Sequence, residues 1–291
     1  MKILTLLKII LTLFFIIFFA CAYTTNEEES FSTDWNIFRG NPSLTACTSV
    51  SLSDNPALLW TFQSNVNTRS SLVVFNGVAY WSSSRGRIFG VNSEGEQVFD
   101  FEMETAVDAP PMVHDSVLYI GRIDGKLCAI SLEKQDILWN FETLGQIVAS
   151  PNWVPIGGKD FIIVGSYDHF LYIIDSKTGE EIKRFESRYY INGAVAQYDN
   201  YVVWGGCDGW LRNENSAFVS VPAVSDKMVF VVSDDQKVYA MKRKEGAIAW
   251  EYLLKGKAGE GAPVICKNKL LVCTKTGIVS MQIHSIMCCV A

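Results

Sequence analysis

The stretch PPMVHDSVLYIGRIDGKLCAISLEKQDILWNFE, residues 110–142, reads as four short strands separated by three turns. Its apolar runs are rich in β-branched and aromatic residues, which is typical of strands, and they cover residues 112–113, 117–121, 127–132 and 137–141. Asp124-Gly125, between the second and third runs, favours a tight hairpin because Gly adopts positive φ without a steric cost. No helical period appears after residue 34. The stretch therefore predicts a four-stranded antiparallel sheet.

The same phrase recurs along the chain. Its central turn is marked in succession by Arg85-Gly86, Asp124-Gly125, Asp168-His169, Asp208-Gly209, Asp235-Gln236 and Thr276-Gly277. Measured at the second residue of each pair, the steps are 39, 44, 40, 27 and 41. A period of about 40 to 45 residues is typical of the four-stranded blades of a propeller. A proline also recurs where each first strand begins, a place that tolerates its missing N–H, at Pro111, Pro151, Pro222 and Pro263. We predict an all-β β-propeller of about six four-stranded blades.

The step of 27 residues indicates one incomplete blade. What should follow Arg212 is the end of a third strand, a turn and a fourth strand, and none is legible before the next phrase begins near Val219. Either this blade lacks its outer strand, or a fused and shortened blade spans the junction. A three-stranded blade would leave an unpaired edge.

The two ends of the repeat also depart from the pattern. The tail HSIMCCVA, residues 284–291, fits no repeat, whereas ALLWTF, residues 57–62, reads as a fourth strand without a blade. Pairing of residues 57–62 with the last blade would close the ring, which is how propellers protect their edges. Without it the ring is imperfectly closed. Aromatic residues of the fourth strands are expected to pack between blades, at Trp60, Phe99, Trp139, Phe185 and Trp250.

The N-terminus has the features of an export signal. Lys2 and Lys8 give a positive start, an almost wholly apolar run covers residues 9–20, and Cys21 follows it. Three interpretations stay open: cleavage before Cys21 with lipid on its sulfur, cleavage after Ala22 to give a freely secreted form, and an uncleaved anchor. We favour the first, with a signal peptide over residues 1–21, a polar tether over residues 22–33 and a propeller domain over residues 34–291. The expected location is then the cell envelope, in the outer membrane or facing the periplasm, with the lipid as the membrane contact.

Charge and composition narrow the function. The 291 residues carry a formal net charge of −6, and a nucleic-acid partner would favour a basic face instead. Cys128, Cys207, Cys266 and Cys273 stand singly in apolar runs, where cysteine usually acts as a small buried hydrophobe. Eight cysteines in an exported chain permit disulfides, but their pairing stays open.

The stretch DWNIFRGNPSLTACTSVSLSDNPALLWTF, residues 34–62, resembles the opening of the PQQ-repeat (quinoprotein-like) propeller family. That opening has the pattern W-x-x-F-R-G-x-P-x-x-T, which is matched here by Trp35, Phe38, Arg39, Gly40, Pro42 and Thr45. Cys47 departs from it, since the family more often has a Gly nearby. The resemblance covers nearly all of residues 34–281.

The resemblance implies one of two kinds of protein. Large members are dehydrogenases that bind pyrroloquinoline quinone and Ca²⁺ in the channel. Small exported members resemble the lipoprotein of the outer-membrane β-barrel assembly machinery, and no cofactor is known for them. The chain is similar to the second kind in its length and its signal.

Few residues suggest chemistry. Cys288-Cys289, with or without His284, lies in the irregular tail, and we expect neither a cofactor nor a metal ion there. Each histidine stands in a strand or turn without a matched partner, so no Ser-His-Asp set is predicted. The recurring Asp124, Asp168, Asp208 and Asp235 are expected to bind their own turns rather than Ca²⁺. Arg39 is expected to tie the N-terminal segment to the ring through backbone carbonyls.

These observations predict a non-catalytic module that binds a protein or an extended peptide through the ring face or channel. Tyr189, Tyr190 and Trp210 are candidates for a recognition patch. The alternatives are a small quinoprotein that oxidises substrates with pyrroloquinoline quinone, and a decayed, truncated copy of a propeller.

Overall fold

The computed structural model divides the chain into two compact units, Met1–Thr33 and Asp34–Ala291. It describes residues 34–291 of the second unit except for 49, 52–53, 199–200, 206–220, 234, 257–261, 275–276, 283–287 and 290–291. The predicted signal peptide, Cys21 and the tether lie outside the described residues. Among those that are described, no helix has the length and hydropathy needed to cross a membrane.

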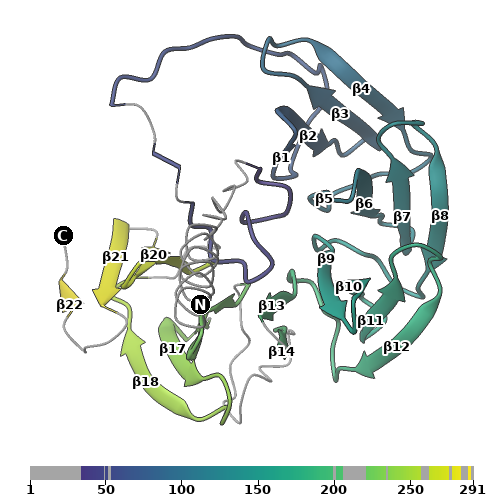
Figure 1. Cartoon of the computed structure of the whole chain (residues 1–291). Helices are drawn as coiled ribbons and strands as arrows, with labels where there is room; N and C mark the ends of the chain where they lie inside the picture. Colours follow the sequence, from purple (N-terminus) through teal and green to yellow (C-terminus); the bar gives the residue numbers. More distant parts are fainter. Residues whose placement is uncertain are drawn as a thin grey trace, which may run out of the picture. The chain divides into compact units, whose positions relative to one another are not determined.

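Six antiparallel sheets, here called blades one to six, follow one another along the described chain (Figure 1). Blade one contains β1 (Val73–Phe75), β2 (Val78–Ser82), β3 (Arg87–Val91) and β4 (Gln97–Glu102). Blade two contains β5 (Met112–His114), β6 (Val117–Gly121), β7 (Lys126–Ser131) and β8 (Ile137–Glu142). Blade three contains β9 (Asn152–Ile156), β10 (Lys159–Gly165), β11 (Phe170–Asp175) and β12 (Glu181–Glu186).

The remaining blades follow the same order. The described strands of blade four are β13 (Ala196–Tyr198) and β14 (Tyr201–Val203). Blade five contains β15 (Ala223–Val224), β16 (Met228–Val232), β17 (Lys237–Lys242) and β18 (Ile248–Leu253). Blade six contains β19 (Val264–Cys266), β20 (Lys269–Thr274), β21 (Gly277–Gln282) and β22 (Cys288–Cys289). In each blade, neighbouring strands along the chain are also neighbours in the sheet.

The local signals of the sequence position these strands. The four strands of blade two match the predicted runs to within a residue or two at each end. The second residue of every described turn pair has positive φ, from 67° at Gln236 to 146° at Gly277. Each of the four recurring prolines directly precedes a first strand, β5, β9, β15 or β19. Turn chemistry and proline placement therefore fix the register of the repeat.

The blades pack face to face in chain order. Alternate side chains of one strand point to opposite faces of its sheet, so Leu118 and Ile120 of β6 join the core shared with blade one while Tyr119 joins the core shared with blade three. Equivalent hydrophobic clusters connect blades three and four, four and five, and five and six. This is the packing of a β-propeller, and the predicted fold class is confirmed. No cluster among the described residues joins blade six to blade one, so closure of the ring is not seen.

Blade four is the shortened one. From the last residue of β14 to the first residue of β15 the chain advances 20 positions, compared with 31 from the end of β10 to the start of β13. The predicted third strand at Trp210–Arg212 and the junction after it lie outside the described residues. The two described strands pair through Ala196–Val203, Gln197–Val202 and Tyr198–Tyr201.

The seam between blades six and one differs from the prediction. Residues 57–62 form no strand and do not pair with blade six, where β22 takes the fourth place beside Ser280 and Met281 of β21. Leu58 and Leu59 are consequently more than four-fifths exposed. The tail that fitted no repeat thus supplies the outer strand that residues 57–62 were expected to provide.

Residues 57–62 nevertheless contact blade one. Their Trp60 and Phe62 make the same kinds of contact with blade one that Trp139 and Phe141 of the outer strand β8 make with blade three. Trp139 of β8 donates from Nε1 to Ser176 O in blade three at 3.0 Å, and Trp60 donates from Nε1 to Ser93 O in blade one at 2.8 Å. Phe141, two residues after Trp139, makes an edge contact with Tyr172. Phe62, two residues after Trp60, makes the same kind of contact with Phe89, at the position equivalent to Tyr172. These residues therefore pack against blade one without the predicted pairing to blade six.

One short segment, here called the hub (residues 35–45), bonds to all six blades (Figure 1). Trp35 pairs with Val74 of β1 through both backbone groups, at 2.8 and 2.9 Å, and the carbonyl of Asn36 accepts from Val113 N of β5 at 2.7 Å. The carbonyl of Pro42 accepts from the Asn152 side chain of β9 at 2.7 Å.

The hub then reaches the other three blades. The Pro42 carbonyl also accepts from Gln197 N of β13 at 2.8 Å. The carbonyls of Ser43 and Thr45 accept from Val224 N of β15 at 3.1 Å and from Ile265 N of β19 at 3.0 Å. These bonds satisfy inner-edge groups that would otherwise be unpaired.

Arg39 and Gly40 shape the hub. The buried Arg39 side chain donates to the carbonyls of Leu44 and Pro263, which confirms its predicted role. Burial lowers the pKa of Arg39 to about 10, so it stays charged at neutral pH. Gly40 has φ +80°, and a Cβ there would lie 2.6 Å from the Trp35 ring. The family-like residues 35–45 thus connect the inner strands of the blades.

Gly40→Ala is expected to destabilise the ring more than Gly77→Ala. Both glycines have similar positive φ, +80° and +74°, but a Cβ at Gly77 meets nothing within 4 Å. Gly77→Ala should therefore cost about 1 kcal/mol of backbone strain, and Gly40→Ala a further ~1–3 kcal/mol for the clash with Trp35. Urea unfolding of both variants measures the difference, and equal costs would contradict a tightly packed hub.

Candidate functional site

The connectors between successive blades have a regular structure, and they carry the candidate site. After the outer strands of blades one, two and three the chain returns to the next inner strand through a connector, and one buried residue anchors each connector: Val107, Ile147 or Ile191. Ile147 N donates to Arg122 O and Ile191 N to Ser166 O, each at 3.0 Å. The connectors therefore lie against the turns between second and third strands, and together they form one face of the ring.

Aromatic side chains gather on this face at blade three. The rings of Tyr167 and Tyr190 stack with centroids 4.8 Å apart, and Tyr189 meets Tyr190 edge-on at 5.5 Å. His169 lies parallel to Tyr189 at 6.2 Å. Leu144, on the preceding connector, is 98% exposed, and Tyr189 is 51% exposed. We call these five residues the tyrosine patch.

The backbone beneath the patch is held rigidly. Tyr167 N donates to Gln146 O at 2.9 Å, and Leu144 N donates to the Asp168 carboxylate at 2.9 Å. A Cβ at Gly145 would lie 2.3 Å from Asp168 N, so the connector and the turn are in close contact. The patch is thus presented on a fixed surface, which lowers the entropy cost of binding.

The scaffold does not require the tyrosines. Tyr189 and Tyr190 stand two and one residues before the anchor Ile191. The equivalent positions are Gly145 and Gln146 before Ile147, and Thr105 and Ala106 before Val107. Small or polar residues therefore serve the same connector elsewhere, and the aromatic pair is a local departure from the repeat.

Two of the four repeated aspartates, Asp168 and Asp235, bind their own turns as predicted. Asp168 accepts from Phe170 N and Asp235 from Lys237 N, each at 3.1 Å. Their second oxygens accept from Tyr172 and Tyr239 hydroxyls, each at 2.7 Å. Burial, and secondarily the bond to Asp168, raises the pKa of Tyr172 to about 12.

Asp124, the first of the repeated aspartates, has a different partner. Asp124 accepts from the Arg122 guanidinium instead, and Cys128 occupies the position of the tyrosine that would bind it. Asp208 and Trp210, the third residue predicted for the recognition patch, lie outside the described residues.

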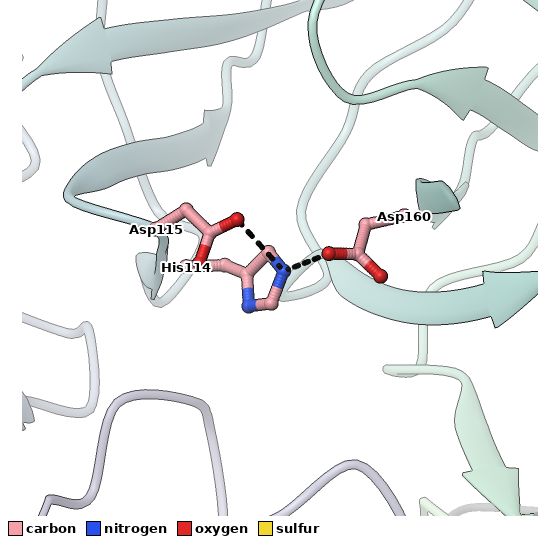
Figure 2. A group of neighbouring side chains, drawn as sticks. All are labelled: His114, Asp115 and Asp160. Carbon is pink, nitrogen blue, oxygen red and sulfur yellow. Dashed lines mark hydrogen bonds and ion pairs between the residues drawn. The ribbon is translucent and has the colours of Figure 1, made fainter. Parts of the chain in front are cut away.

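A second cluster lies where blades two and three meet, near the turns between their first and second strands (Figure 2). His114 ends β5, Asp115 follows it in the turn, and Asp160 is the second residue of β10. His114 Nε2 lies 2.9 Å from Asp160 Oδ2 and 3.8 Å from Asp115 Oδ2. The expectation that no histidine has a partner is therefore wrong for His114. The partner was missed because it lies 46 residues away, in the next repeat.

Four cysteines whose side chains the structure describes, Cys47, Cys128, Cys266 and Cys273, are free thiols. Cys128 is buried as predicted, but the prediction of burial is wrong for Cys273, which is exposed, and only partly met by Cys266, which is half-buried like Cys47. Burial raises the pKa of Cys128, which keeps its thiol protonated at neutral pH. Cys207 and His284 lie outside the described residues.

Consecutive antiparallel blades around a shared inner segment define the class of this protein as a β-propeller. Residues 48–189 and 191–284 match the profile of the family described as outer membrane protein assembly factor BamB. The chain belongs to that family.

A solved structure supports the fold. The crystal structure of BamB from Moraxella catarrhalis is similar with a TM-score of 0.53 and 13% sequence identity, over 76% of this chain and 84% of that chain. At this identity the likeness concerns the fold. No curated protein matches the chain.

Proposed function

We propose that this protein is a non-catalytic, lipid-anchored binding module of the cell envelope, and that the tyrosine patch contacts its protein partner. The observation that carries the proposal is the placement of Tyr189 and Tyr190 at connector positions where the repeat elsewhere has Gly145, Gln146, Thr105 and Ala106. The family's description as an outer membrane protein assembly factor supports a protein as the partner.

The chemistry of the patch suits a polypeptide. Tyrosine offers a large apolar face and a hydroxyl at low entropy cost, and it is enriched among the residues that dominate binding energies. Leu144, with 98% of its surface exposed, adds an apolar side chain on the connector that is bonded to the turn at Asp168. Such a mixture fits an apolar side chain flanked by backbone polar groups.

The ring face suits this role better than the channel does. The hub already bonds to inner strands of all six blades, from Val74 of β1 to Ile265 of β19. A peptide entering the channel by strand addition would have to displace these bonds, whereas the patch needs no rearrangement. Of the two binding surfaces expected from the sequence, this favours the ring face over the channel.

The double variant Leu144→Ser with Tyr189→Ala should weaken partner binding at least tenfold, or about 1.4 kcal/mol, without changing thermal stability. A photoreactive residue at position 189 should crosslink in cells and identify the partner, whose affinity for the purified variants is then measured. Ile182→Ala is the matched control, because Ile182 is also exposed, at 55%, but lies on the outer strand β12. Equal losses in the control and the double variant would contradict the proposed contact.

Cys21→Ser should release the protein into the soluble exported fraction. The motivation is the positive start, the apolar run over residues 9–20 and the cysteine that ends it. Mass spectrometry of the wild-type protein should find lipid on an N-terminal Cys21. A soluble wild-type protein that begins at Tyr23 would rule out the anchor.

Adding pyrroloquinoline quinone and Ca²⁺ to the purified protein should produce no dye-linked dehydrogenase activity. Arg39, the charged hub residue, is already engaged by the carbonyls of Leu44 and Pro263. Activity that depends on both additions, together with quinone absorbance that stays with the protein through gel filtration, would instead establish the quinoprotein alternative.

A further inference from the structure

We propose that His114, Asp115 and Asp160 form a binding site for a divalent transition metal ion, with Zn²⁺ as the best fit. The three residues come from two blades, and their ligand atoms all lie within 4.8 Å of one another (Figure 2). The site is separate from the tyrosine patch and does not depend on the proposed binding function.

The distances suit first-row metals. Zinc binds imidazole nitrogen and carboxylate oxygen at about 2.0–2.2 Å, so tetrahedral ligand atoms lie about 3.3–3.6 Å apart. His114 Nε2 is 2.9 Å from one carboxylate oxygen and 3.8 Å from the other. Opening the first of these separations and closing the second by less than an ångström, and drawing the two carboxylate oxygens together from within 4.8 Å, would admit the ion in place of the hydrogen bond between His114 and Asp160.

The His114 ring is fixed in position by its neighbours. It stacks on Trp153 of β9, with centroids 4.2 Å apart and planes at 19°. The His114 side chain is only 13% exposed, and its edge is directed toward Asp160 of the neighbouring blade. A ring fixed by stacking loses little freedom when it coordinates, so the binding cost is reduced.

The surroundings add negative charge and open space. A cavity of about 250 Å³ adjoins the cluster and is lined by Asp115, Asp160 and Asp175. The Tyr119 hydroxyl reports the field of these carboxylates, because burial first and then all three charges raise its pKa. Lys159 and Lys177 also line the cavity, and they leave it one negative charge in excess.

Donor type selects the metal. Asp175 lies outside the three-residue group, and its Oδ1 accepts from the amides of Lys177 and Thr178, so two carboxylates and one imidazole form the ligand set. Ca²⁺ prefers six to eight oxygen ligands, whereas one nitrogen with two oxygens and water in the open position suits Zn²⁺. The bound ion would join blade two to blade three.

Nuclear magnetic resonance of the full chain, labelled with ¹⁵N-histidine in detergent, tests the site with zinc chloride as the probe. The chain has three histidines, so single substitutions assign their signals, and the readout is blind to zinc bound only by cysteine. Zinc should shift the ring nitrogens of His114 and not those of His169. His114→Gln should remove the response, and Asp160→Asn, which keeps a hydrogen bond to the ring, should lower zinc affinity at least tenfold.

The control is His169→Gln, which should leave zinc affinity unchanged. Gln236 already occupies the equivalent turn position, at φ 67° compared with 77° for His169. Zinc should also raise the Tm of the wild type and of this control but not that of Asp160→Asn. No shift at His114 at millimolar zinc, or unchanged affinity in a folded Asp160→Asn, would overturn the proposal.

Discussion

The hydrogen bonds of the hub are the constraint on which this ring depends. A propeller blade offers an unpaired edge at its innermost strand, and unpaired backbone groups away from water are costly. Here one segment, from Trp35 to Thr45, supplies partners to the inner strands of all six blades. Blades that otherwise contact only their neighbours are thereby coupled to a common element, which matters most at the seam, where the described residues show no sheet contact that closes the ring.

Much of the fold could be predicted from the sequence because single residues determine where its turns and strands begin. Gly125 and Pro111 mark a turn and a strand start through their own backbone limits, and the structure follows them. The seam could not be predicted in this way. The pattern of Trp60 and Phe62 is that of a fourth strand, and these side chains do contact blade one, but strand pairing with blade six depends on the competing β22.

The candidate sites also combine features that the sequence predicts with contacts that only the folded ring creates. Tyr189 and Tyr190 could be singled out because they are neighbours in sequence and break a pattern, although Leu144 and Tyr167 join them only through the packing of connectors and turns. His114 and Asp160 occupy adjacent repeats, and only the contact between the two blades brings them together. Repetition thus explains the scaffold, whereas the proposed recognition patch lies where the repeat is broken and the proposed metal site lies where two blades meet.

The order of synthesis determines when the hydrogen bonds of the hub can form. Its residues leave the ribosome before those of any blade, yet its last partners, Pro263 and Ile265, follow about 220 residues later. At about 5–20 residues per second, roughly 10 to 45 seconds separate the two ends of a single hydrogen bond. During that interval the first blades have no complete centre around which to assemble. Contacts so distant in sequence slow folding, so the ring becomes whole only when its sixth blade arrives.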